Sequence, residues 1–208
     1  MGFAGLFILG FSIVLIWKIY QTQKFKLTPF VPQNSDFKLQ PPTLALTGKV
    51  EQITREVKKR SREDKDFREI KTGEKIIQGE ILSTGEKARV EVVFPGFVKL
   101  KIQPNSEIGF SDLIAEEFLL SQRNGSVTYE FIDSKNTLSV RSLHLLSAIQ
   151  TGITQINVES QQGRVTLENI SGKTKIAYVN SENKTQVLEL TKGKTIFDDT
   201  THTIQTVP

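Results

Sequence analysis

Apolar and polar residues are distributed unevenly along this chain, and the contrast is strongest at its start. Residues 1–17 carry no charged side chain, whereas all 27 lysines and arginines and all 23 aspartates and glutamates follow them. The run 2–20 is apolar except for Ser12 and Lys18. As a helix rising about 1.5 Å per residue, it would span roughly 28 Å, close to the hydrocarbon core of a bilayer. We therefore predict one transmembrane helix, residues 1–20, that anchors a polar domain.

The flanks of this run favour an uncleaved anchor over a cleaved secretory signal, because no basic stretch precedes it and no small-residue cleavage site follows it. Aromatic rings and lysines would lie at one membrane interface, in contact with the headgroups. The residues predicted there are Trp17, Lys18, Tyr20, Lys24 and Lys26. Residues 21–43 contain four prolines, which lack the backbone N–H of helices and central strands, so we predict an extended tether.

From residue 70 onward, apolar and polar residues alternate in short runs, which is the pattern of half-buried strands. The clearest runs are 88–94, 98–102, 127–132, 137–140, 154–158, 165–170, 175–179, 185–190 and 194–197. Gly152, residues 124–125 and residues 171–172 are among the turn-type positions between them. The spacing of apolar residues in 112–120 predicts one or two helical turns.

Many short strands at roughly ten-residue spacing predict an all-β sandwich, barrel or short solenoid. Of these we expect a short-stranded β-solenoid or a twisted β-sandwich, over residues 44–200, followed by a tail at 201–208. The segment 51–69 is ambiguous, because its mixed charges suit an exposed helical face or a charged hairpin loop between two strands. We favour a charged loop at 56–66.

The net charge of +4 has a local source, because residues 55–71 hold eight basic and five acidic side chains. A nucleic-acid-binding stripe is normally more one-signed, so we expect no nucleic-acid partner. The basic side chains could bind an anionic partner such as a lipid headgroup or an acidic polysaccharide. A solvated loop is the alternative, because acids are interspersed. This candidate patch consists of Arg55, Lys58, Lys59, Arg60, Arg62 and Lys65.

Catalytic and metal-binding patterns are weak in this sequence. The chain has no cysteine and two histidines, His144 and His202, whose spacing suggests no metal site. The adjacent carboxylates at 116–117 and 198–199 would point to opposite faces of a strand, beside no nucleophile. No nucleophile elbow and no phosphate-binding glycine loop is present. We expect no catalytic residues, no cofactor, no metal and no enzymatic activity.

Several of these segments follow one another in an order found in a known family. Residues 46–50 read Leu-Thr-Gly-Lys-Val, and 73–85 read Gly-Glu-Lys-Ile-Ile-Gln-Gly-Glu-Ile-Leu-Ser-Thr-Gly. The strand-like runs 88–94 and 98–102 come next, closed by Pro-Asn-Ser at 104–106, with Gly-x-Val-like steps at 125–127 and 163–165. This succession resembles the FecR-type extracytoplasmic domain of bacterial envelope proteins, over about residues 46–199. Its family-like turn residues are Gly73, Gly79, Thr84, Gly85, Pro104, Asn105, Ser106, Gly125, Gly163 and Gly193.

The chain departs from that family in two places. Residues 150–154 match its pattern poorly. The family's iron-signalling members carry a cytoplasmic anti-sigma segment before the membrane helix, and here one residue precedes the apolar run. Their transmembrane sigma regulation is therefore not carried over. We expect a non-catalytic interaction module that binds an envelope protein or glycan. The alternatives are an accessory sensor acting through a separate cytoplasmic regulator, and an envelope structural or lipid-transport β-jellyroll protein.

Two signals disagree on the side of the membrane that holds the domain. The lysines that follow the apolar run favour the cytoplasm by the positive-inside tendency. The FecR resemblance and the layout of anchor, tether and domain favour the outside. We expect a single-pass protein of the bacterial inner membrane with its domain in the periplasm or outside the cell. The sequence carries no signal for an oligomeric state.

Overall fold

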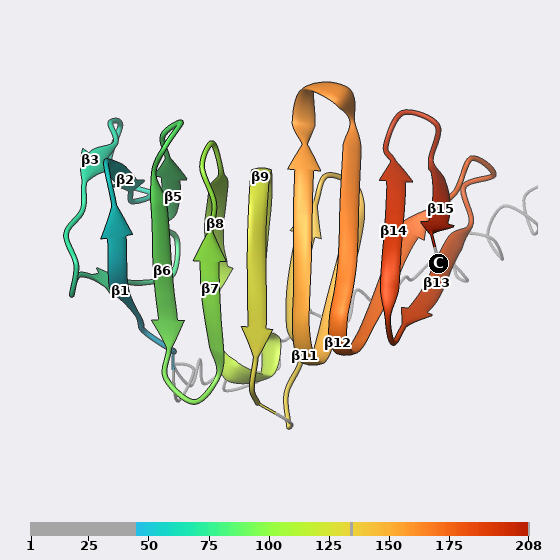
Figure 1. Cartoon of the computed structure of the whole chain (residues 1–208), viewed down its shortest axis with the longest axis horizontal. Coiled ribbons are helices and arrows are strands. Elements are labelled where there is room, and N and C mark those ends of the chain that lie inside the picture. The colour runs from blue at the N-terminus through green and yellow to red at the C-terminus, as the bar shows by residue number, and fades with distance from the viewer. Residues whose placement is uncertain (1–44, 134, 208) are drawn as a thin grey trace, which may run out of the picture. The chain divides into compact units, whose positions relative to one another are not determined.

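The computed structural model describes residues 45–133 and 135–207, and these form an all-β structure, as the alternating pattern predicts (Figure 1). The first strands are β1 (Gly48–Thr54), β2 (Val57–Arg60), β3 (Arg68–Glu69), β4 (Lys75–Ile76), β5 (Ile81–Thr84), β6 (Arg89–Phe94), β7 (Val98–Ile102) and β8 (Glu107–Asp112). They are followed by β9 (Leu119–Phe131), β10 (Leu138–Ser142), β11 (Leu145–Glu159), β12 (Arg164–Val179), β13 (Thr185–Leu190), β14 (Gly193–Asp198) and β15 (Thr203–Val207). Two short 3-10 helices interrupt them, η1 (Ala115–Glu117) and η2 (Ser160–Gln162).

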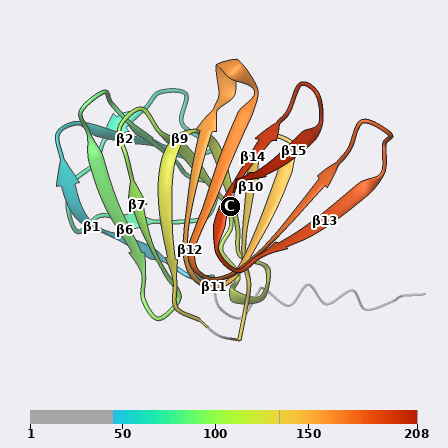
Figure 2. The same ribbon diagram turned by 45° about the vertical axis from the view of Figure 1, so that its right-hand side comes forward.

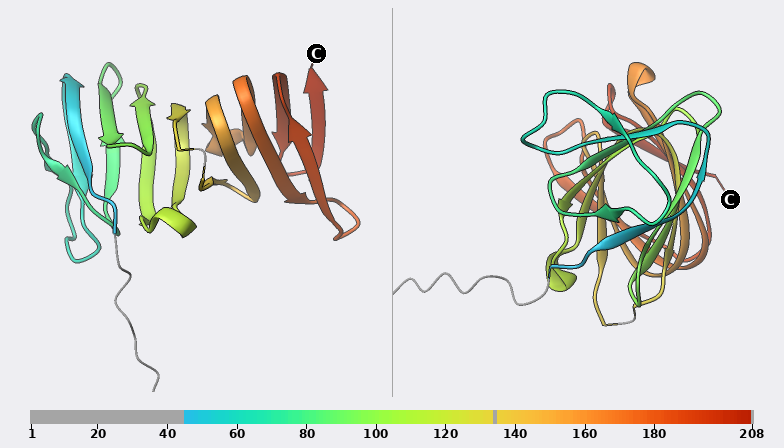
Figure 3. Two further views of the ribbon diagram at one scale, coloured as in Figure 1. Left: turned by 90° about the horizontal axis from the view of Figure 1, so that it is seen from below. Right: turned by 90° about the vertical axis from the view of Figure 1, so that its left-hand side faces the viewer.

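All 15 strands belong to one continuous sheet, which is folded so that two layers face each other (Figure 3). The first layer contains, in order, β4, β1, β6, β7, the second part of β9, the second part of β11, the first part of β12, β14 and β15. The second layer contains β3, β2, β5, β8, the first part of β9, β10, the first part of β11, the second part of β12 and β13.

The hydrophobic core lies between the two layers. Phe94 of β6 and Phe110 of β8 meet there from opposite layers, with ring centroids 5.9 Å apart. Phe118 packs edge-on against Phe94 at 5.0 Å, and all three rings are fully buried. Near the other end, Tyr178 of β12 contacts Phe197 of β14 at 5.5 Å. Figure 2 shows the layers diverging at that end, where β13 stands apart from β14 and β15.

Three long strands pass from one layer to the other by bending at a glycine. Gly125 in β9, Gly152 in β11 and Gly172 in β12 have φ of +80°, +92° and +84°, which residues with a Cβ rarely adopt. Gly152 and Gly172 are direct partners in the β11–β12 pair. A Cβ on Gly152 would lie 2.2 Å from the carbonyl oxygen of Ser171. These glycines were predicted as turns between short strands, but each is a bend inside one long strand.

The segment 51–69 is neither a helix nor one charged loop. It contains the end of β1, all of β2 and β3, so the loop predicted at 56–66 is wrong for Val57–Arg60, which pair with β5. Alternate burial explains the strand, because Val57 and Lys59 are buried while Lys58 is exposed. The loop itself covers residues 61–67. The helical turn expected within 112–120 is present as η1.

The ends of the chain differ in what the structure describes. The tail predicted at 201–208 contains β15, which pairs with β14. The anchor at 1–20, its interface residues Trp17, Lys18, Tyr20, Lys24 and Lys26, and the tether at 21–43 all lie outside the described residues. No helix within residues 45–133 and 135–207 has the length and apolar character that crossing a membrane requires.

Candidate functional site

A straight row of residues crosses the outer face of the second layer from β2 to β10. The pairing register places Arg60 beside Ile81, Ile81 beside Gly109, Gly109 beside Ser121, and Ser121 beside Arg141. Directly paired residues point to the same face of a sheet, so two arginines flank Ile81 and two very small residues, Gly109 and Ser121. The surface is hollowed along this row, with a volume of about 480 Å³. We call this the arginine hollow.

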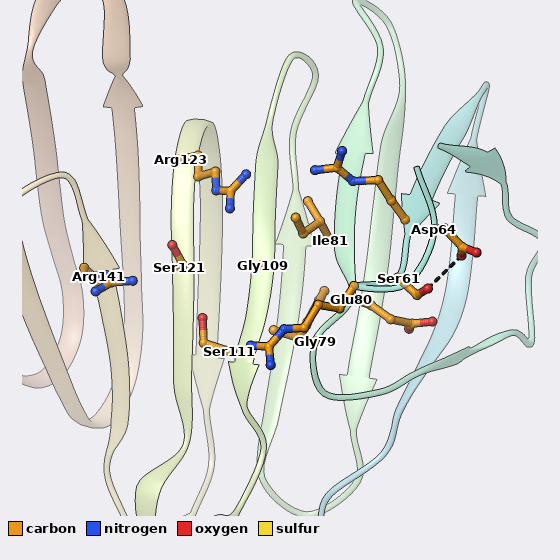
Figure 4. Close-up of a pocket in the computed structure, with 13 residues that line it drawn as sticks. Ser61, Asp64, Gly79, Glu80, Ile81, Gly109, Ser111, Ser121, Arg123 and Arg141 are labelled. Carbon is orange, nitrogen blue, oxygen red and sulfur yellow. Dashed lines mark hydrogen bonds between the residues drawn. The ribbon is translucent and has the colours of Figure 1, made fainter. Parts of the chain in front are cut away.

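The floor of the arginine hollow is low because of its residue sizes. Gly109 has no side chain and Ser121 a short one, while the outer positions of neighbouring strands carry longer side chains. Figure 4 shows Arg123 and Arg141 on one side of Gly109, and Ser61 and Asp64 on the other. The residues that line the hollow are Arg60, Ser61, Arg62, Asp64, Gly79, Glu80, Ile81, Gly109, Phe110, Ser111, Ser121, Arg123 and Arg141.

The four arginines of the hollow differ in what they contact. The Arg60 guanidinium lies over the Phe67 ring, 4.8 Å from its centroid, which is a cation–π contact. Arg123 donates to the Glu107 carboxylate at 2.9 Å. Among the described residues, no ion pair or side-chain hydrogen bond involves Arg62 or Arg141. Within that part of the chain, the guanidinium donors of these two residues make no contact with a carboxylate.

The two carboxylates of the hollow are already occupied by partners within the chain. Asp64 accepts a hydrogen bond from the Ser61 hydroxyl at 2.8 Å. Glu80 is buried, lies 2.7 Å from the Lys59 ammonium, and accepts from the backbone N–H of Ile77 at 2.9 Å. Within the lining, the only serine hydroxyl that contacts either carboxylate is that of Ser61, which donates to Asp64, and the lining contains no histidine. The arrangement is suited to binding an anion.

Beneath the hollow, Lys59 is the centre of a buried ion cluster. Its ammonium contacts Glu80 at 2.7 Å and Glu74 at 3.2 Å, and it donates to the Lys75 carbonyl at 2.9 Å. Burial would raise the pKa of Glu74, but hydrogen bonds from Arg68, the backbone of residue 71 and Lys59 outweigh it and lower the pKa to about 2. Glu74 is therefore charged throughout the physiological pH range.

The structure divides the basic patch predicted from the sequence. Arg60 and Arg62 line the hollow, whereas Lys59 points inward and is not available to a partner. Lys58 lies 2.6 Å from Glu56, and this hydrogen bond raises the pKa of Lys58. Arg55 is an exposed corner residue with φ of +63°, away from the hollow, and Lys65 is exposed in the loop 61–67.

Sequence reasoning missed Arg123 and Arg141, because distant strands bring them to the hollow. Arg141 shares a row with Arg60 only through the pairing of β10 with β9, β9 with β8, β8 with β5 and β5 with β2. One signal was available in the sequence. Arg141 occupies an outward position between buried Val140 and Ser142, whereas Arg123 follows buried Gln122 and precedes half-buried Asn124.

Most of the family-like turn residues form corners of the sheet, and among them only Gly79 lines the hollow. The Thr84 hydroxyl donates to the Gln103 carbonyl at 2.7 Å and accepts from the Ser106 N–H at 2.9 Å, which ties the turn after β5 to the turn after β7. Asn105 lies in the same corner with φ of +54°, next to Pro104. Gly79 lines the hollow. Four other glycines of the family-like set have positive φ, namely Gly73, Gly125, Gly163 and Gly193. Gly85 lies in the turn before β6.

The two histidines come together at the edge between the layers, which their sequence spacing did not indicate. His144 Nδ1 lies 3.0 Å from Asp199 Oδ1, and the ring of His202 is 6.3 Å from that of His144. This contact joins the β10–β11 turn to the β14–β15 turn. Within the described part of the chain, no group of three or more histidine, cysteine or acidic residues is arranged to hold a metal ion.

Comparison with known proteins shows similarity in fold alone. No family model matches the chain, and no curated protein matches its sequence. Two crystal structures, both described as a "putative anti-sigma factor" from Parabacteroides distasonis ATCC 8503, are similar to it with a TM-score of 0.53. Their sequences are 13% and 12% identical to this chain. The match covers 61% of this chain and 58% of each of those chains, so this chain shares with them a fold over little more than half their length.

Proposed function

We propose that this chain is a non-catalytic binding protein of the bacterial envelope that recognises an acidic glycan at the arginine hollow. One observation carries the proposal. Arg62 and Arg141 have no ion-pair partner among the described residues, and they line the same hollow as the small residues Gly109 and Ser121. Guanidinium groups bind carboxylates through two parallel hydrogen bonds, which gives both charge and geometric selectivity.

The rest of the lining supports a sugar ligand. The hydroxyl groups of Ser61, Ser111 and Ser121 face an open and polar hollow, where they can exchange hydrogen bonds with sugar hydroxyls. The hollow crosses four strand-to-strand steps from β2 to β10, about 19 Å at roughly 4.8 Å per step. That length suits several linked sugar rings better than one small anion. An acidic peptide from an envelope protein is the competing ligand.

Binding of a defined oligosaccharide to the full chain tests this proposal. Tetragalacturonate is titrated into the chain by calorimetry, with uncharged maltotetraose as the matched ligand. We expect binding of the acidic sugar alone, and the double variant Arg62→Gln/Arg141→Gln loses about tenfold or more in affinity because two charge-assisted contacts are removed. Arg89→Gln, an exposed arginine on β6 of the first layer, is the control and binds as the parent does.

Three outcomes would contradict the proposal. They are no binding of tetragalacturonate, equal binding of maltotetraose, and equal loss of affinity in the control variant. A further arm uses a polyglutamate peptide of similar charge. Tighter binding of this peptide than of the acidic sugar would identify a protein partner and overturn the glycan assignment.

The location of the domain is part of the same proposal. The charge-free run 2–20 and the proline-containing stretch 21–43 support an anchor in the inner membrane and a tether to a domain outside it. Alkaline phosphatase fused to the C-terminus is active only outside the cytoplasm, so an active fusion is the expected result. An inactive phosphatase fusion together with a fluorescent cytoplasmic reporter at the same position would place the domain inside.

A second candidate function is sensing by a FecR-type domain. Its support is the fold shared with structures described as an anti-sigma factor and the order of segments over residues 46–199. In this alternative, ligand binding at the β domain is passed to a separate regulator through residues 1–20. Deleting the chain would then change transcription in response to the acidic glycan. Unchanged transcription with intact glycan binding would reject the sensor and leave the binding module.

A further inference from the structure

The row of residues that forms the arginine hollow does not stop at Arg141. The pairing register continues it from Arg141 to Leu146 on β11, from Leu146 to Ala177 on β12, and from Ala177 to Val187 on β13. All lie on the same outer face of the second layer, because directly paired residues share a face. Leu146 is 41% exposed and Val187 is 63% exposed. A cationic hollow is therefore continuous with an apolar strip.

The strip is apolar where an ordinary outer sheet face would be polar. Val179, 43% exposed, lies two residues beyond Ala177 on β12 and points to the same face. From β11 to β13 the strip crosses two strand-to-strand steps, about 10 Å at roughly 4.8 Å per step. The other exposed large apolar side chains among the described residues, Ile77, Ile132, Ile170 and Val207, lie outside this row.

We infer that the ligand of the arginine hollow is an acidic glycolipid, whose charged sugar binds at the hollow and whose acyl chain lies along Leu146, Ala177 and Val187. This inference rests on the proposed function and specifies its ligand. Two observations favour an amphiphile over a free acidic sugar. Arg62 and Arg141 of the hollow have no ion-pair partner within residues 45–133 and 135–207, and the apolar strip begins at the residue directly paired with Arg141. Covering exposed apolar side chains with hydrocarbon removes both surfaces from water, which is favourable.

The test uses three small probes that differ by one feature at a time. Glucuronic acid carries the charged head alone, hexyl glucuronide adds an apolar chain, and hexyl glucoside keeps the chain without the charge. Each is titrated into the full chain, with tetragalacturonate as the reference for the hollow itself. We expect hexyl glucuronide to bind about tenfold more tightly than glucuronic acid, and hexyl glucoside to bind more weakly than hexyl glucuronide by a similar factor.

Variants of the strip separate it from the hollow. The double variant Leu146→Ser/Val187→Thr should lose the advantage of hexyl glucuronide over glucuronic acid and keep its affinity for tetragalacturonate. Ile132→Thr, which removes an exposed apolar side chain elsewhere, is the matched control and should behave as the parent does. Both substitutions in the double variant are at exposed positions, so a thermal melt is expected to confirm an unchanged fold.

The possible failures of the inference and of the proposed function differ. Binding of tetragalacturonate with equal affinities for glucuronic acid and hexyl glucuronide would overturn the glycolipid inference alone. No binding of any acidic probe would overturn the proposed function as well. Equal binding of hexyl glucoside and hexyl glucuronide would overturn the inference, because the strip would then act without the hollow. So would a concentration-dependent dimer that the strip variant abolishes while the affinities for all probes stay unchanged, because the strip would then be a contact between copies.

Discussion

Two neighbouring residues of β2, Lys59 and Arg60, have opposite environments. Lys59 points between the layers and is held by Glu80, Glu74 and a backbone carbonyl. Arg60 points outward, rests on the Phe67 ring and lines the arginine hollow. Both belong to one basic cluster in the sequence, yet the alternation of a strand separates them by face. The charge on the inner face therefore contributes to the stability of the fold, whereas the charge on the outer face lines the arginine hollow.

The largest expected effect is on the inner face. Replacing Lys59 with methionine leaves the buried Glu80 carboxylate without its cation, and breaking a buried ion pair on one side costs about 3–5 kcal/mol. The free energy of unfolding, measured by urea denaturation, should fall by that amount. Arg60→Gln is the outer-face counterpart, and its loss should stay below about 1 kcal/mol, the usual contribution of an exposed cation–π contact. Equal losses would contradict the division between the faces.

The next effect is a pH dependence that comes from Glu74. The pKa of Glu74 is about 2 in the fold, below its ordinary value of 4.5. Such a lowered pKa stabilises the fold fully above about pH 4.5, and this stability is lost as the pH falls toward 2. Because Glu74 is partly exposed, solvent screening reduces its contribution to about 2 kcal/mol. Denaturant titrations at pH 6, 4, 3 and 2 should show this loss, and Glu74→Gln should flatten the curve in that range. An equally steep curve in Glu74→Gln would assign the effect to other groups.

Substitution of two glycines should have different effects on stability, because Gly125 lies in the bend of β9 and Gly109 in the floor of the arginine hollow. Gly125 has φ of +80°, and a Cβ there would lie 2.2 Å from the Ser106 hydroxyl oxygen and 2.6 Å from the Asn105 carbonyl oxygen. Gly125→Ala should therefore destabilise the chain by about 2 kcal/mol, through backbone strain and displacement of that corner. Thermal and urea melts measure the loss. An unchanged midpoint would show that β9 can bend without its glycine.

Gly109→Ala is the matched change in the hollow and has the smallest effect on stability. A Cβ at this position would lie 3.8 Å from Ile81 and Ser121, which is ordinary contact, so the free energy of unfolding should change by less than about 0.5 kcal/mol. The added methyl group raises the floor of the hollow, so the affinity for tetragalacturonate should fall about threefold, roughly 0.6 kcal/mol. Calorimetry checks the affinity. Unchanged binding would indicate that the ligand does not reach the floor.

The sequence predicted best where apolar and polar residues alternate without interruption. The runs 98–102 and 185–190 coincide with β7 (Val98–Ile102) and β13 (Thr185–Leu190). It failed at β11 and β12, because a glycine with positive φ marks a turn in most sequences and a bend inside a long strand here. Whether a glycine bends a strand or ends it depends on the two layers that the strand joins, and local sequence carries no information on those layers.

The candidate site was predictable only in part for a related reason. Arg60 and Arg62 belong to a dense basic cluster and were noticed as such. Arg123 and Arg141 are isolated basic residues, and their place beside the same hollow depends on the register of five strands from β2 to β10. Lys59 was misassigned to the surface because its segment was expected to be a loop, in which no inward face exists.

The most direct test of the central claim is a map of where an acidic sugar binds. Backbone amide shifts of the full chain are recorded by NMR during titration with tetragalacturonate. The account predicts saturable shifts concentrated at Gly79, Gly109, Ser111, Ser121 and Arg141, on the outer face of the second layer. Shifts centred on the outer face of the first layer, or the absence of any saturable shift, would contradict it.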